Sequence, residues 1–166
     1  IRDRSPSRGL GDVYKRQALD GTMNIVRVNH VRWTTAAHYT DLTNTTNITG
    51  FACSIVSKLA GSQFLVAIQH TGILFCDGEL GLKRNGTQVV SNLTGTDRDY
   101  TPNYHDVNTY AGLFLDTGIS STAGTTYTYQ VTARATGCDR DGWFNRDPSG
   151  STNNGRCSVT VWEVSP

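Results

Sequence analysis

The sequence is poor in charge, in methionine and in long apolar runs. Only 17% of its 166 residues are charged, the formal net charge is +1, and there is one Met. A general nucleic-acid binder is normally basic, so this balance argues against nucleic acid as a partner. No apolar run approaches the roughly 18 residues that a membrane span needs, so we expect no membrane insertion.

Catalytic and metal-binding signatures are missing as well. The chain has no Gly-x-Ser-x-Gly, no His-Glu-x-x-His and no phosphate loop. Its four histidines lack paired ligand spacing, and Asp139-x-Asp141-Gly142 lacks the further oxygen ligands of a calcium loop. We therefore expect no enzymatic activity, no cofactor and no metal. A buried catalytic dyad is the alternative that one sequence leaves open.

What the sequence does contain favours strands and turns. It has 23 Thr and 17 Gly, and Thr is a β-branched residue that suits the pleated surface of a sheet, whereas Gly supplies turns. No window of 15 residues keeps a helical period. The composition therefore predicts an all-β fold of many short strands, in a chain long enough for one domain.

Alternating and apolar stretches predict where the strands lie. They cover residues 24–33, 48–58, 63–75, 80–90, 109–116, 125–136 and 159–164. Gly61-Ser62 predicts a tight antiparallel connection between two of these strands. Asn85-Gly86, flanked by alternating residues, predicts a β-hairpin because both turn positions need a positive φ. Residues 91–108 are polar and are expected to form a long loop.

The last strand has apolar side chains on both of its faces. Val159 and Val161 share one face, and Trp162 and Val164 lie on the other. Only one face of a sheet can meet the core of a sandwich. We therefore expect Trp162 and Val164 to contact another copy of the chain; the alternative is that Trp162 covers the sandwich edge.

The first seventeen residues, IRDRSPSRGLGDVYKRQ, carry five basic side chains and no apolar core. They lack the apolar stretch of a signal peptide. A basic arm is one interpretation. The favoured one is a resemblance to translated adapter read-through at the ends of metagenomic assemblies. Residues 1–21 are then a disordered, non-native leader, and residues 22–166 form a single domain.

Three later stretches follow a pattern known from one family. They are YAGLFLDTG, TTYTYQVTARATG, and WFNR followed by SVTVWEV. This order resembles the C-terminal half of jelly-roll head domains in marine phage structural proteins, which relate in shape to TNF/C1q-like trimeric heads. GSQFLVAIQHTG followed by LGLKRNGTQVV is similar to an earlier block of the same proteins. The resemblance covers most of residues 48–164 and rests on strands, not on a catalytic motif.

The resemblance implies an antiparallel two-sheet sandwich of the jelly-roll type. It also implies a homotrimeric component of the phage particle surface, such as a tail-fibre or tail-tip head, that lies beside other virion proteins. Such a head would bind a host-surface receptor, for example a glycan or an outer-membrane component. A capsid decoration protein and a secreted carbohydrate-binding module are the alternatives. A hydrolase is less favoured because the sequence offers no site.

Aromatic, acidic, His and Arg residues in the loops are the candidates for receptor binding, because such side chains anchor many binding sites. These candidates are Asp99, Tyr100, Tyr104, His105, Trp143, Phe144 and Arg146. Trp143 and Phe144 are equally interpreted as packing residues.

Two of the four cysteines bracket a loop that departs from the family pattern. Cys138 and Cys157 lie at the ends of two neighbouring predicted strands. A disulfide between them would add about 3 kcal/mol of stability, but phage proteins assemble in a reducing cytoplasm, so both redox states stay open. Cys53 and Cys76 lie in apolar strands, where a small buried thiol is the usual state.

Overall fold

The computed structural model of the chain describes residues 24–74, 78–93, 108–135, 141–145 and 157–165. Within these ranges the chain forms strands and no helix, as its composition predicts. The strands are β1 (Ile25–Trp33), β2 (Ala37–Tyr39), β3 (Thr46–Val56), β4 (Gln63–Leu74), β5 (Gly78–Arg84), β6 (Thr87–Val90), β7 (Asn108–Asp116), β8 (Thr126–Ala135), β9 (Gly142–Phe144) and β10 (Cys157–Val164).

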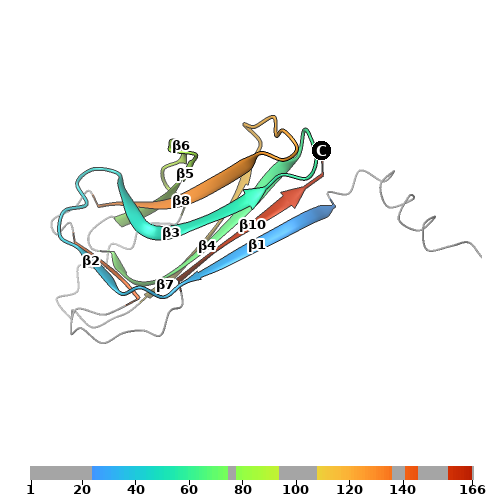
Figure 1. The fold of residues 1–166 in the computed structure, drawn as a ribbon. Coiled ribbons are helices and arrows are strands. Elements are labelled where there is room, and N and C mark those ends of the chain that lie inside the picture. The colour runs from blue at the N-terminus through green and yellow to red at the C-terminus, as the bar shows by residue number, and fades with distance from the viewer. Residues whose placement is uncertain (1–23, 75–77, 94–107, 136–140, 146–156, 166) are drawn as a thin grey trace, which may run out of the picture.

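The strands build two antiparallel sheets that pack face to face as a sandwich (Figure 1). The six-stranded sheet follows the order β1-β10-β4-β9-β2, and β7 pairs with β4 as well. The four-stranded sheet follows the order β3-β8-β5-β6. Each sheet therefore joins strands from distant parts of the chain, which is consistent with a jelly roll. The prediction of an all-β, two-sheet antiparallel sandwich is confirmed.

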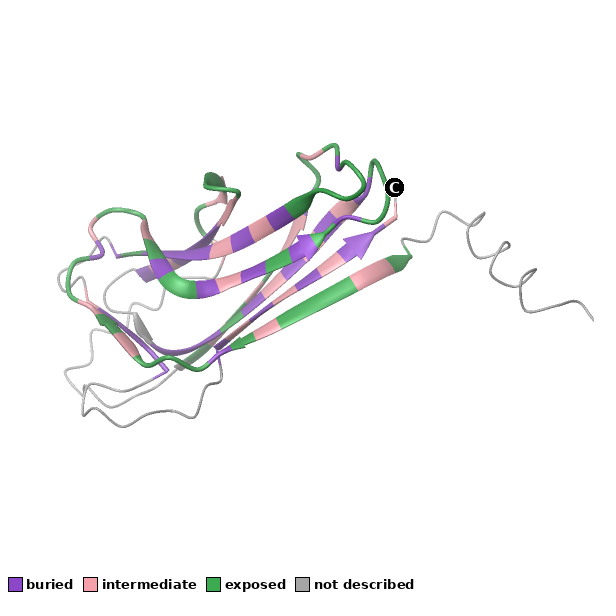
Figure 2. Ribbon diagram, viewed as in Figure 1, coloured by how far each residue is buried: buried purple, intermediate pink, exposed green. Residues whose placement is uncertain are grey.

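The core lies between the sheets and follows from alternation along each strand. Figure 2 shows buried and exposed positions alternating along β3, and buried positions alternating with half-buried ones along much of β8. In β8, Tyr127, Tyr129 and Val131 are buried, as predicted, and meet side chains of the opposite sheet such as Phe64. At one end of the core Trp33 stacks on Phe51, with ring centroids 5.0 Å apart. A sandwich of this kind is held together mainly by such apolar burial.

The predicted hairpin at Asn85-Gly86 is confirmed. Asn85 has φ 48° and Gly86 has φ 86°, and these two residues connect β5 to β6. Both values lie in the left-handed region that the turn requires and that Asn and Gly adopt most easily. The side chain of Asn85 adds a hydrogen bond, because its Oδ1 accepts from the Thr128 amide at 2.8 Å. This contact ties the hairpin to the neighbouring strand β8.

The prediction that Gly61-Ser62 makes a tight antiparallel connection is wrong. β3 belongs to the four-stranded sheet and β4 to the six-stranded sheet, so residues 57–62 cross from one sheet to the other. Stacked sheets lie about 10 Å apart, a distance that a two-residue hairpin cannot bridge. The two apolar strands therefore lie in different sheets instead of pairing, and β3 packs opposite β1 and β10.

The closing strand β10 lies in the interior of its sheet, between β1 and β4. Its Val159 and Val161 are fully buried against the core, and Trp162 lies on the opposite side and is half-buried. The core therefore explains the two buried valines, and Trp162 is left on the side that points away from it. Glu163, which shares the inward side with the valines, is buried as well, and its partners are described below.

Candidate functional site

The side of the six-stranded sheet that points away from the sandwich, here called the outer face, is the candidate interaction surface. The antiparallel register aligns side chains of β1, β10, β4 and β7 in rows across this face. One row, here called the apolar row, consists of Val28, Trp162, Leu65 and Leu115. Four neighbouring apolar side chains on an outward-facing surface are unusual unless something covers them.

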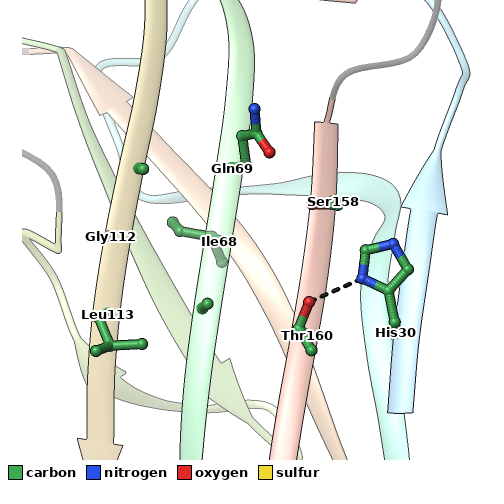
Figure 3. Close-up of a pocket in the computed structure, with 9 residues that line it drawn as sticks. His30, Ile68, Gln69, Gly112, Leu113, Ser158 and Thr160 are labelled. Atoms are coloured by element: carbon green, nitrogen blue, oxygen red, sulfur yellow. Dashed lines mark hydrogen bonds between the residues drawn. The ribbon is translucent and has the colours of Figure 1, made fainter.

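Beside the apolar row the face is hollowed where Ala67 and Ala111 carry small side chains, and Figure 3 shows residues that line this hollow. The hollow has a volume of about 480 Å³ and is lined by His30, Ala67, Ile68, Gln69, Ala111, Gly112, Leu113, Ser158 and Thr160. Its depth follows from Ala and Gly on β4 and β7, where neighbouring positions carry Leu. His30 and Thr160 bond to each other across its wall, with Nδ1 and Oγ1 2.8 Å apart.

Charge separates this face from the outward side of the other sheet. Along the register from the apolar row to the row of Arg32, Ser158, Gln69 and Ala111, the only ionisable side chains are Arg32 and His30, and no carboxylate occurs. The outward side of the four-stranded sheet instead carries Glu79, Lys83 and Arg134. Interface cores are depleted in charge, so the outer face of the six-stranded sheet has the composition of a contact surface and the other sheet that of a solvated one.

The exposed fraction of each side chain in a single chain shows which residues of this region are available to a partner. Leu113 is 62% exposed and Val28 53% exposed, and Trp162 is half-buried. Val164 is only 3% exposed, so it has little surface left to offer a partner. Trp162 thus keeps its place as a candidate contact residue and Val164 does not. Sequence reasoning missed Val28, Leu65, Leu113 and Leu115; the apolar runs FLVAI and GLFL, which lack strict alternation, were the available signal.

The aromatic pair predicted as either receptor-binding or packing lies on β9, at the end of the sandwich away from the C-terminus (Figure 1). Phe144 is fully buried and contacts the rings of Trp33, Tyr39 and His70. It is therefore a packing residue and is not available to a receptor. Trp143 is 9% exposed and stacks on His38, with ring centroids 4.2 Å apart.

His38 also reaches a carboxylate, because its Nε2 lies 3.1 Å from Asp141 Oδ2. His38, Asp141 and Trp143 thus form a small cluster at this end of the sandwich. The remaining receptor-binding candidates lie outside the described residues and stay predictions. They are Asp99, Tyr100, Tyr104, His105 and Arg146.

Asp116 at the end of β7 is the centre of a buried polar network that joins the two sheets. Arg84 from β5 donates from Nη1 to both carboxylate oxygens of Asp116, at 2.7 and 2.6 Å. Tyr129 from β8 donates its hydroxyl to Asp116 Oδ2 at 2.8 Å. Burial, followed by the Asp116 carboxylate, raises the pKa of Tyr129, so the phenol stays protonated. This arrangement is structural, since every group in it is already paired.

Glu163 is a second buried carboxylate, and it holds the crossing between the sheets. Its oxygens accept from the amides of Lys58 and Leu59 at 2.8 to 3.0 Å and from the Ser57 hydroxyl at 2.9 Å. Burial by itself would raise the pKa of Glu163, but the hydrogen bonds from Leu59, Lys58 and Ser57 outweigh it and lower the pKa. The carboxylate therefore stays ionised and fixes the start of residues 57–62.

Cys157 and His70 form a buried pair that resembles a nucleophile and base. The Cys157 Sγ and His70 Nδ1 lie 3.5 Å apart, and both side chains are fully buried. Burial raises the pKa of the Cys157 thiol to about 11 and lowers that of His70 to about 3. An activated thiolate needs shifts of the opposite sign and access to solvent. The pair therefore acts in packing.

The structure tests the predictions about cysteines and metal binding only in part. Cys157 carries a free thiol in the structure, so the predicted bridge to Cys138, which lies outside the described residues, is not seen there. Cys53 is a buried free thiol, as its apolar strand predicts, and Cys76 lies outside the described residues. Among the residues that the structure describes, no three His, Cys, Asp or Glu side chains are grouped to hold a metal ion.

Comparison with known proteins does not place the chain in a family. No family model and no curated protein matches the chain. Within the described ranges, the structure also contains no helix of the length and apolar character that crossing a lipid bilayer requires.

Proposed function

We propose that this chain is a non-enzymatic head domain of a phage particle, which assembles as a homotrimer through the outer face and binds a receptor on the host surface. The observation that carries the proposal is the apolar row, beside which the neighbouring rows of β1, β10, β4 and β7 carry no carboxylate. The resemblance of the strand pattern to phage head domains supplies the virion setting.

The free energy gained by covering the apolar side chains of the outer face is considerable. Fully burying a large apolar side chain stabilises by about 1.5–3 kcal/mol. Leu113 and Val28 are more than half exposed in one chain, and Trp162 keeps part of its surface accessible. Three copies that cover these side chains gain this free energy in every contact. Because the face carries few charged groups, the cost of removing such groups from water is small.

Assembly also serves receptor binding. Three identical loops held on one rigid body bind a repetitive surface more tightly than one loop does, because the second contact forms at high effective concentration. The ends of the sandwich and the four-stranded sheet stay accessible when the outer face is covered (Figure 1). The receptor-binding candidates in residues 94–107 and at Arg146 are therefore proposed to act from loops.

The experiment that tests the proposal is sedimentation of the purified chain. A homotrimer would have a mass near 54 kDa, three times the 18.1 kDa of one chain. The Trp162→Asp variant should dissociate and keep the circular dichroism of a β-sandwich. Thr126→Asp, the same charge on the exposed outward side of the other sheet, is the matched control and should leave the trimer intact.

An 18.1 kDa monomer at every concentration would contradict the proposal and favour the rival function, a secreted carbohydrate-binding module. A trimer that survives Trp162→Asp would show that a different surface makes the contact.

A further inference from the structure

The apolar row and the hollow lie next to each other on the same face. Thr160, which lines the hollow, is separated from Trp162 by a single inward-facing residue of β10. The face therefore presents a strip of large apolar side chains beside a depression whose lining mixes the small Ala67 and Ala111 with larger side chains such as Leu113. A surface that carries a projection and a depression side by side is complementary in shape to a displaced copy of itself.

The structure also disfavours one other way in which copies could join. β3 is the terminal strand of the four-stranded sheet, and its edge carbonyls would otherwise invite strand pairing. Asn29 Nδ2 donates to the carbonyl of Ser54 at 2.6 Å, and Arg27 Nη1 donates to that of Val56 at 3.0 Å. Because side chains of β1 occupy these carbonyls, this edge is protected, and contact through the outer face is favoured.

We infer that the hollow receives the apolar row of a second copy of the chain, with Trp162 as the side chain that enters it. This inference rests on the self-association proposed above and adds to it the place and manner of contact. Ala67, Ala111 and Leu113 offer an apolar lining, and His30 and Thr160 already satisfy each other by their hydrogen bond. An apolar occupant therefore leaves the hydrogen bond between His30 and Thr160 intact.

The size of the face agrees with an occupant of this kind. Four strands about 4.8 Å apart, each with about eight residues at about 3.4 Å, give a flat area of roughly 500 Å². A stable interface buries about 800 Å² of accessible surface per partner. The relief of the side chains raises the accessible area above the flat value, so the outer face as a whole approaches the size that one contact needs.

A substitution that fills the hollow with apolar atoms tests the inference. Ala111 is exposed on β7, and Ala111→Leu adds apolar surface without adding charge. A face that is merely sticky would associate more tightly after this change. A hollow that must accept Trp162 would be blocked, and we expect self-association to weaken by about tenfold or more, as overpacking does. Ala111→Val is the smaller step and should weaken it less.

Ala52→Leu is the matched control, since it makes the same change on the outward side of the four-stranded sheet. It should leave association unchanged. Circular dichroism of each variant reports the fold, and sedimentation over a range of concentrations reports the association constant. Shortening the entering side chain, Trp162→Leu, should restore part of the affinity in the Ala111→Leu background, because the two sites are coupled.

The outcomes separate the two proposals. Weaker association of both folded Ala111 variants, graded by size and partly rescued by Trp162→Leu, supports the occupied hollow. Unchanged or tighter association of either variant overturns it, and leaves the trimer proposal standing. A wild-type chain that stays monomeric removes the trimer proposal and the occupied hollow with it.

Discussion

His70 allows a direct test of the core through the pH dependence of stability. The side chain is fully buried, its ring stacks on Tyr110 and packs on Phe144, and its Nδ1 faces the Cys157 thiol. In the described part of the structure, its Nε2 has no hydrogen-bond partner. Burial therefore lowers the pKa of His70 from 6.5 to about 3 in the folded chain.

The direction of the effect follows from linkage. The unfolded chain binds a proton at His70 below about pH 6.5, and the folded chain does not bind one until about pH 3. The free energy of unfolding is thus complete above pH 6.5 and falls as the pH decreases from 6.5 toward 3. One pKa unit corresponds to about 1.4 kcal/mol, so at pH 5 His70 alone should lower the free energy of unfolding by about 2 kcal/mol.

The measurement is urea unfolding at pH 8, 6 and 5, at one protein concentration because self-association also stabilises. In His70→Gln the side chain no longer titrates, so the loss between pH 8 and pH 5 should shrink by about 2 kcal/mol. The variant should be less stable at pH 8, since the aromatic packing is lost. The quantity to compare is therefore the change in the free energy of unfolding with pH. His30→Gln removes an exposed imidazole and should keep the slope that His70 causes. Equal slopes in wild type and His70→Gln would refute the assignment of a neutral, buried His70.

Two further predictions concern the buried carboxylates. Asp116→Ala leaves the Arg84 guanidinium and the Tyr129 hydroxyl without their acceptor and should lower the free energy of unfolding by about 3–5 kcal/mol; a loss below about 1 kcal/mol in urea unfolding would contradict the buried network. Glu163→Gln replaces a charged acceptor of two amides and the Ser57 hydroxyl, so we expect a loss of about 1.5–3 kcal/mol. Amide hydrogen exchange in residues 57–62 should then become faster, and unchanged protection there would show that Glu163 does not hold the crossing.

Much of the local structure could be predicted from the sequence, because it depends on residues that are close along the chain. Asn85-Gly86 specifies its hairpin, since both residues adopt a positive φ at low cost. The alternation in residues 125–136 specifies which side of β8 is buried. The two-sided apolar character of Val159 to Trp162 predicted a core on one face, which the buried valines confirm, and a partner on the other face, which stays a prediction.

The candidate site residues could be predicted less well from the local sequence. Phe144 looked like a loop aromatic available to a receptor, but the contacts with Trp33 and His70 that bury it come from residues far away in the sequence. Val164 has the pattern of an interface residue and is instead buried in a single chain. A burial fraction depends on what packs above a side chain, and alternation along one strand contains no such information.

The sequence by itself determined that the chain forms strands, where its hairpin turns, and that its last strand is apolar on both sides. These properties follow from backbone preferences and from the two-residue period of a strand, which are local. Only the tertiary structure decided that β3 and β4 lie in different sheets, that Asp116 meets Arg84 and Tyr129, and that residues of four strands line a hollow beside the apolar row. Register between strands distant in sequence sets all of these, because a shift of one residue would turn each side chain to the opposite face.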